Sequence, residues 1–250
     1  MGDTVFRYRS NNIKVLEELA ENYVYFTNRE KLNDPYDCYP GMIKISEDIN
    51  LLLDSTFDHD SFISESILST EELSQRRDYY SKNPELFVGI IKDQIDKILN
   101  KLGFACFSKQ ATNLLMWSHY ANFHKGLCIE FDITLDKGFF NNLSPMDYLD
   151  EMPKFTYPFK MGDAIFHKAL TTKHKGWVNE EELRVVRSEH GRCTFDPKCV
   201  KSIYFGIDAS PNFIKDVFKA TRHYANINYY RSSPLKDKFG LRFNKIRKLN

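Results

Sequence analysis

The sequence predicts an α+β fold, in which a single domain over residues 1–250 is built on one mixed sheet and carries a helical insertion at about residues 43–102. Short segments that alternate apolar and polar side chains, as half-buried strands do, recur along the chain. Segments with apolar residues at helical spacing lie between them. The 20 Phe and 14 Tyr residues favour a packed fold rich in strands. No linker or internal repeat divides the chain, so one domain is the most economical interpretation.

The first part of the chain is expected to form a strand, a helix, a strand and a loop. VFRYR alternates apolar and basic side chains, and NNIKVLEELAEN places apolar residues at helical spacing behind asparagines that can cap a helix. YVYFTN is the second strand, and NDPYD ends it because Pro35 has no N–H. Residues 43–102 are mostly helical, with Thr70 as the expected cap and Pro84 dividing the run into two helices.

The rest of the chain alternates in the same way. FACFS, residues 104–108, predicts a short strand, residues 112–121 a helix and LCIEFDI a further strand. Residues 136–162 are rich in proline and loops. KSIYFGIDAS predicts a strand, and the helix after it begins with Ser210 as cap and Pro211 in the first turn. INYYRSS and GLRFNKI are the last expected strands.

The charge balance and the cysteine content limit which classes of protein this chain can belong to. The 35 basic and 34 acidic residues give a net charge of +1, so only a local patch would attract a polyanion. The five cysteines are odd in number and form no CxxC pair, which indicates reduced thiols in the cytoplasm rather than disulfides or a zinc site. No apolar run has the length of a signal peptide or membrane span, so we expect a cytoplasmic protein without a membrane partner. The oligomeric state stays open.

The segment TNLLMWSHYANFHKG gathers polar and aromatic side chains that are common in functional sites. They are Trp117, His119, Tyr120, His124 and Lys125. An amphipathic helix with an aromatic core side and a wet C-terminus has the same pattern, so both interpretations stay open. Two histidines five residues apart, with no carboxylate between them, are poor zinc ligands, and we predict no metal site.

A second candidate is WVNEEELRVV, residues 177–186. If this segment is a strand, alternation places Glu180, Glu182 and Arg184 on one face. Such charges are costly to bury without partners. They are therefore solvated at a sheet edge or organised around a ligand, and the sequence does not separate these two alternatives.

Two further motifs lie near the N-terminus. Arg7 and Arg9 share a strand face and suit a phosphate or pyrophosphate, although a basic face paired with acidic neighbours has the same pattern. In LNDPYD, the side chains of Asn33, Asp34 and Asp37 most simply shape a turn, with metal binding by the two aspartates as the alternative. The sequence has no GxGxxG, GxxxxGK[ST] or GxSxG motif, which removes the simplest dinucleotide, P-loop and hydrolase interpretations.

Together these motifs resemble a bacterial family known as a domain of unknown function. The shared features are an early Tyr-Arg, the NDP(F/Y)(D/E) turn, Cys-Phe-Ser, WxHYAxxHxG and a late WxxExExR. All are present here and cover most of the chain outside the helical insertion. The resemblance supplies no assigned reaction.

The order of elements is also similar, in outline, to ADP-ribosyltransferases that place an arginine on the first strand. That resemblance implies NAD as substrate. Arg9 or Arg7 would then hold the pyrophosphate, and Ser108 would fix the nicotinamide ribose. Glu182 would bond the ribose 2′-hydroxyl and stabilise the oxocarbenium ion, while Glu180 would orient or deprotonate the acceptor. The serine stands in CFS rather than in a Ser-Thr-Ser triplet, which is a departure from the outline.

Other residues complete the predicted site. Trp117 or Tyr120 would stack on a ring of the nucleotide. His119 is a further catalytic candidate, and Lys125 and Arg184 are further binding candidates. The expected function is an ADP-ribosyltransferase-like enzyme, with a nucleotide ligand and a nucleic acid or protein acceptor. The resemblance suggests a bacterial toxin or phage-defence effector.

Two alternatives belong to other functional classes. A metal-independent nuclease would use His119 and His124 for proton transfer, with a lysine or arginine to stabilise the phosphorane-like charge. A non-enzymatic module would use the same side chains to bind a nucleotide without turnover. In the enzymatic interpretations, the helix at 113–121 faces the strand at 178–186, and His119, Tyr120 and Glu182 converge in one pocket.

Overall fold

The structure is a computed structural model that describes residues 3–57, 69–159 and 163–247. The chain forms two compact units, each made of separate stretches of sequence. Unit 1 comprises Met1–Thr27, Gly103–Met146 and Gly176–Asn250, and unit 2 comprises Asn28–Leu102 and Asp147–Lys175. Helices and a large mixed sheet confirm the predicted α+β class.

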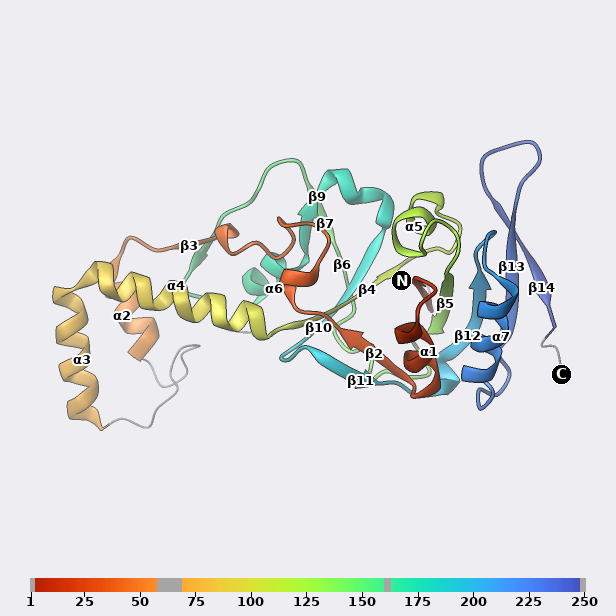
Figure 1. The fold of residues 1–250 in the computed structure, drawn as a ribbon. Helices are drawn as coiled ribbons and strands as arrows, with labels where there is room; N and C mark the ends of the chain where they lie inside the picture. The colour runs from red at the N-terminus through yellow and green to blue at the C-terminus, as the bar shows by residue number, and fades with distance from the viewer. Residues whose placement is uncertain (1–2, 58–68, 160–162, 248–250) are drawn as a thin grey trace. The chain divides into compact units, whose positions relative to one another are not determined.

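Unit 1 is built on a sheet that has eight strands among the described residues (Figure 1). Its order is β14-β13-β12-β5-β1-β4-β10-β6. Only β12 and β13 run parallel to each other among these neighbours, because α7 connects them as a crossover. The strands are β1 (Thr4–Arg9), β4 (Gly103–Ser108), β5 (Leu127–Asp132), β6 (Ser144–Pro145), β10 (Glu182–Arg187), β12 (Val200–Phe205), β13 (Asn228–Pro234) and β14 (Leu241–Ile246).

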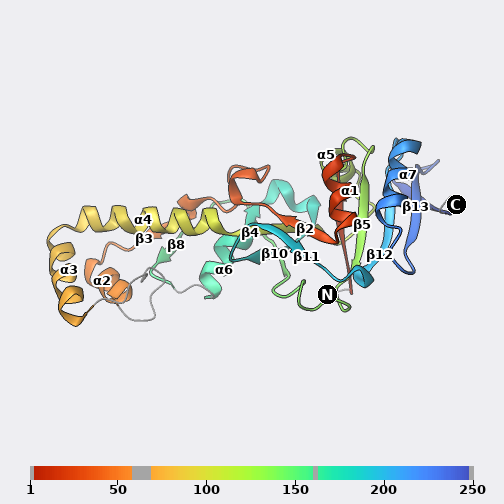
Figure 2. The same ribbon diagram turned by 60° about the horizontal axis from the view of Figure 1, so that its bottom comes forward.

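Three α-helices of unit 1 begin at polar caps. Asn12 accepts a hydrogen bond from the Val15 N–H at the start of α1 (Ile13–Ala20). Ser210 caps α7 (Pro211–Ala220) as predicted. Asn113 caps α5 (Leu114–Tyr120), which is shorter than the expected helix. Helices α1 and α7 contact each other (Figure 2).

The two faces of this sheet have different cores. One face contributes the larger hydrophobic cluster, which includes side chains of α1 and α7. Its strand residues include Val5, Phe107, Ile129, Leu183 and Ile203. The opposite face packs Tyr8 and Cys128 against Trp117 of α5. Alternation along these strands therefore directs successive side chains toward opposite cores, as Tyr8 and Val5 of β1 illustrate.

A 3₁₀ helix at Lys175–Glu180 precedes β10, so the strand expected over residues 178–186 begins at Glu182. Glu181 has a φ of 44°, and this left-handed conformation separates the helical turn from the strand. The prediction that Glu180 belongs to the strand face is therefore wrong.

A second sheet of unit 1 pairs β2 (Tyr23–Phe26) with β11 (Gly191–Thr194), and a 3₁₀ turn, Pro197–Cys199, precedes β12.

In the stretch that was expected to be mostly helical, the described residues of unit 2 form three α-helices. They are α2 (Ile49–Phe57), α3 (Thr70–Lys82) and α4 (Pro84–Lys101), and Pro84 divides α3 from α4 as predicted. Ser69, rather than the expected Thr70, caps α3, because the Ser69 hydroxyl accepts from the Glu72 N–H while the Glu72 carboxylate accepts from the Ser69 N–H. Residues 58–68 of this stretch lie outside the described residues.

The remaining elements of unit 2 are short. Two parallel pairs join β3 (Ile43–Ile45) to β8 (Phe155–Tyr157), and β7 (Asp147–Leu149) to β9 (Thr172–His174). Helix α6 spans Ala164–Thr171, and 3₁₀ turns form at Arg29–Lys31 and Pro40–Met42. The loop-rich stretch 136–162 thus holds short strands, and its residues 160–162 lie outside the described part of the chain. Within the described ranges, we find no helix with the length and apolar character of a membrane span.

Candidate functional site

Glu182 and Arg184 form a buried ion pair on β10. The Arg184 Nε donates to the Glu182 Oε1 at 2.7 Å, and the two side chains are 0% and 3% exposed, in that order. The Arg184 guanidinium also lies over the Phe104 ring, 5.6 Å from its centroid. Of the two alternatives left open for this segment, a solvated edge is therefore excluded for these two side chains.

Glu180 precedes this pair in sequence, and its carboxylate forms a hydrogen bond with the side chain of Tyr120. The Tyr120 hydroxyl donates to the Glu180 carboxylate, which is 7% exposed. The amide of Asn113 donates to the Asn179 carbonyl. These two hydrogen bonds confirm that the helix at 113–121 meets the segment that begins at residue 178.

A second carboxylate is tied to the end of β4. The side-chain amide of Gln110 donates to the Glu181 carboxylate at 2.7 Å. The backbone carbonyl of Gln110 accepts a hydrogen bond from the Tyr8 hydroxyl at 2.8 Å. Ser108 is fully buried and lies opposite Glu182 in the register of β4 and β10. We call Ser108, Gln110, Tyr120, Glu180 and Glu181 the polar cluster.

The strands that carry the motifs are neighbours in the sheet. β4 lies between β1 and β10, with Ser108 opposite Phe6 on one side and Glu182 on the other. Residues that are opposite each other in a sheet point to the same face. Ser108, Glu182 and Arg184 therefore share the face on which α5 packs.

Arg7 and Arg9 point to the other face. Since Phe6 shares the face of Ser108, alternation directs the odd-numbered residues of β1 toward the core beneath α1. Arg9 pairs with Glu18 of α1 at 2.6 Å. An arginine of β1 was expected to bind the ligand on the same face as Ser108 and Glu182, but both arginines lie on the opposite face. For Arg9, the alternative of a basic residue paired with an acidic neighbour is the one observed.

The environment of Arg7 explains its orientation. Its guanidinium donates to the Cys106 carbonyl at 3.1 Å and lies 5.5 Å from the centroid of the Phe107 ring. Burial, followed by the neighbouring charge of Arg9, lowers the pKa of Arg7 to about 10. Arg7 is thus a buried structural cation that links β1 to β4.

The other residues of the aromatic segment divide between core and solvent. Trp117 is fully buried, and its Nε1 donates to the Ala111 carbonyl at 2.7 Å, so its ring has no face left for stacking on a nucleotide. His124 stacks on Trp117 with ring centroids 6.0 Å apart, and burial lowers its pKa. His119 and Lys125 are exposed. The ring of His119 is 6.3 Å from that of Tyr120 and lies beside the polar cluster rather than inside it.

The LNDPYD segment of unit 2 forms the simple turn that its sequence indicates. The Asp34 carboxylate accepts from the Tyr36 N–H at 2.9 Å. Asp37 is buried and lies 3.7 Å from the Lys173 ammonium, which is also buried. Lys173 thus provides a countercharge for Asp37, a role that the sequence alone did not indicate.

Sequence reasoning missed three members of this region. Gln110 fixes Glu181, while Asn113 and Asn179 join α5 to the 3₁₀ helix. The available signal was weak: Asn113 precedes a helix, where asparagine commonly serves as a cap, and it also does so here. Nothing in the sequence indicates that its amide group reaches residue 179 at the same time.

Comparison with known proteins gives one match. A family model described as "Protein of unknown function (DUF2971)" matches residues 116–185, which is less than a third of the chain. No curated protein and no solved structure matches. The matched segment begins in α5, ends in β10 and contains Tyr120, Glu180 and Glu182. Over these residues the chain is similar to a family whose function has not been assigned.

Proposed function

We propose that the chain is an ADP-ribosyltransferase-like enzyme that acts on NAD, with Glu180 as its reactive carboxylate. One observation carries the proposal: the Glu180 carboxylate is almost fully buried, yet it accepts a hydrogen bond from the hydroxyl of Tyr120, a half-buried residue. A carboxylate fixed in this way can stabilise positive charge that develops on a ribose as nicotinamide leaves. We therefore assign stabilisation of the oxocarbenium ion to Glu180 rather than to Glu182, because Glu182 forms a buried ion pair with Arg184.

The proposed step transfers an ADP-ribosyl group. The bond between C1′ of the ribose and the nicotinamide nitrogen breaks, and its electron pair leaves with nicotinamide. An acceptor oxygen then bonds to C1′ and gives its proton to the Glu180 carboxylate. We assign the ribose hydroxyls to Gln110, whose side-chain amide donates to the carboxylate of the next residue along the chain from Glu180, Glu181. The acceptor is a group on nucleic acid or protein, or water in the absence of either.

Nicotinamide release tests the proposal. Purified protein is incubated with NAD, with and without nucleic acid or cell lysate, beside Glu180→Gln and Tyr120→Phe variants. We expect Glu180→Gln to lower kcat by about a hundredfold or more, and Tyr120→Phe to lower kcat more than it raises KM. Glu21→Gln is the matched control, because this exposed glutamate pairs with Arg192.

Unchanged release by Glu180→Gln, or no release from the wild-type protein, would contradict the proposal. Cleavage of RNA or DNA in a chelator, abolished by His119→Ala, would support the nuclease alternative. A thermal shift with nucleotide but without turnover would support the binding module. If the protein is a toxin or phage-defence effector, its expression will slow bacterial growth, and Glu180→Gln will restore growth.

A further inference from the structure

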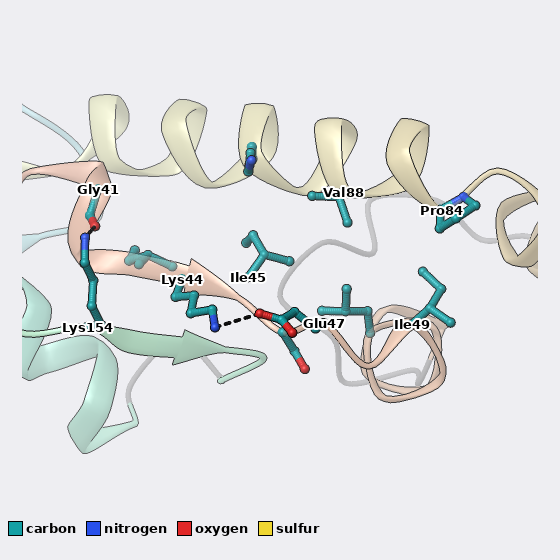
Figure 3. Close-up of a pocket in the computed structure, with 12 residues that line it drawn as sticks. Gly41, Lys44, Ile45, Glu47, Ile49, Pro84, Val88 and Lys154 are labelled. Atoms are coloured by element: carbon teal, nitrogen blue, oxygen red, sulfur yellow. Dashed lines mark hydrogen bonds and ion pairs between the residues drawn. The ribbon is translucent and has the colours of Figure 1, made fainter.

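Unit 2 contains a cavity of about 540 Å³ between β3, α2 and α4 (Figure 3). The twelve residues that line it are Gly41, Ile43, Lys44, Ile45, Ser46, Glu47, Ile49, Leu52, Pro84, Val88, Lys92 and Lys154. This volume is within the range of about 300–1,000 Å³ that small-molecule sites occupy. All twelve residues belong to unit 2, so the cavity is complete without unit 1.

The lining is aliphatic rather than aromatic. Ile45 of β3 and Val88 of α4 point toward one another across the space, and Ile49 lies on α2 below them (Figure 3). Leu52 adds a fully buried side chain. No aromatic ring is among the twelve lining residues. Such a surface suits a flexible hydrocarbon chain better than a planar ring, which would gain from stacking.

The border of the cavity carries more positive than negative charge. Three lysines and one glutamate line it, which leaves an excess of two positive charges. Lys44 pairs with Glu47 at 2.9 Å, and this contact lowers the pKa of Glu47, so the glutamate stays ionised. Lys154 donates to the Gly41 carbonyl at 2.6 Å. Both lysines are therefore engaged within the lining.

Lys92 is the lysine left for a ligand. It is exposed on α4, and its ammonium has no hydrogen-bond or ion-pair partner within residues 3–57, 69–159 and 163–247. The long methylene stem of a lysine packs along apolar surface while its ammonium reaches the border. Lys92 thus combines a methylene stem that can extend the apolar wall with an ammonium that has no partner in the described part of the chain.

We propose that this cavity binds a medium-chain aliphatic carboxylate, with the hydrocarbon chain between Ile45 and Val88 and the carboxylate on Lys92. The aliphatic lining provides the affinity, and the excess of positive charge selects an anionic head group. This site shares no residue with the polar cluster and does not depend on the reaction proposed there.

Calorimetric titration of the full chain with hexanoate, octanoate and decanoate tests the proposal. We expect affinity to rise by about threefold to fourfold for each added methylene, until the cavity is filled. Lys92→Gln is expected to weaken decanoate binding by about tenfold while leaving the uncharged decanol unaffected. The matched control is Lys97→Gln on the same helix, because Lys97 pairs with Asp93 and is absent from the lining.

A second variant tests the position of the hydrocarbon chain. Val88→Phe fills part of the space and is expected to weaken both decanoate and decanol, with folding verified by the wild-type circular dichroism spectrum. If Val88→Phe does not fold, the comparison between Lys92→Gln and Lys97→Gln decides alone. Absence of binding to the wild-type chain overturns the proposal. Decanoate binding that Lys92→Gln leaves unchanged also overturns it.

Discussion

The Arg184 guanidinium donates to the Glu182 carboxylate two residues earlier on β10, and both side chains are buried. Removing one charge of such a pair leaves the other in a medium that solvates it poorly. The pair is thus a buried structural feature of β10, and Glu182 follows the proposed reactive carboxylate of Glu180 by two residues in sequence.

Loss of Arg184 is expected to be strongly destabilising. Arg184→Met leaves the Glu182 carboxylate buried without this cation and should lower the free energy of unfolding by about 3–5 kcal/mol. Urea unfolding followed by circular dichroism measures it. Arg192→Met is the control: Arg192 pairs with Glu21 at the surface, where both side chains are 55% exposed, and its loss should cost less than about 1 kcal/mol. Equal effects of the two variants would contradict the structural role.

Acid is expected to destabilise the protein in part through His124. Burial lowers the pKa of His124, and the charge of Asp208 opposes this in part. Below the unfolded-state pKa of about 6.5, the unfolded chain binds a proton that the folded chain resists, so this contribution to stability is present above that pH and is lost below it. The difference in Tm between about pH 7.5 and about pH 5.5 should therefore be smaller in His124→Asn than in the wild type. His119→Asn, which removes an exposed imidazole, should keep the wild-type difference.

The five thiols are expected to react in two classes. Cys38, Cys128 and Cys199 are buried, and burial raises the pKa of Cys199 to about 12 and that of Cys128 well above its usual value. Because the thiolate is the reactive form, Ellman's reagent should modify at most two thiols rapidly in the folded protein, Cys106 and Cys193. All five should react in guanidinium chloride. Rapid reaction of more than two thiols in the folded chain would contradict the burial.

Alanine at two glycines is expected to change stability in opposite directions. A Cβ at Gly206 would lie 1.9 Å from the His124 carbonyl oxygen, so Gly206→Ala forces the backbone apart where β12 ends. Gly89 lies within α4, and a Cβ there meets nothing within 4 Å. Gly89→Ala should raise the free energy of unfolding by up to about 1 kcal/mol, whereas Gly206→Ala should lower it by more than that. Urea unfolding of both variants measures the two signs.

Local patterns predicted most elements because their causes are local. The cap at Ser210 and the break at Pro84 depend on chemistry within a few residues, and both appear where they were expected. The start of β10 was misplaced because Glu181 adopts a left-handed conformation, which the sequence does not mark with glycine or asparagine. Three consecutive left-handed residues at 122–124 were likewise not foreseen.

The site was harder to predict because it depends on which face of the sheet each helix covers. Alternation correctly put Arg7 and Arg9 on one face of β1, but only the return of α1 over that face supplies Glu18 as a partner. The link between Tyr120 and Glu180 is likewise a long-range contact. Period-two patterns give relative orientation along one strand and say nothing about the element that packs above it.

The position of β1 has a consequence for how the chain folds as it is synthesised. β1 is the first strand, yet it lies inside the sheet between β5 and β4, so both partners follow the whole helical stretch of unit 2 in sequence. At about 5–20 residues per second, the ribosome needs roughly five to twenty seconds to make the chain that separates β1 from β4. During that interval neither strand partner of β1 has been synthesised, and of the elements of unit 1 only α1 and β2 are available to cover its apolar side chains. Slowing translation within α3 and α4 would lengthen the wait and increase dependence on chaperones, whereas slowing it after β5 would affect this strand far less.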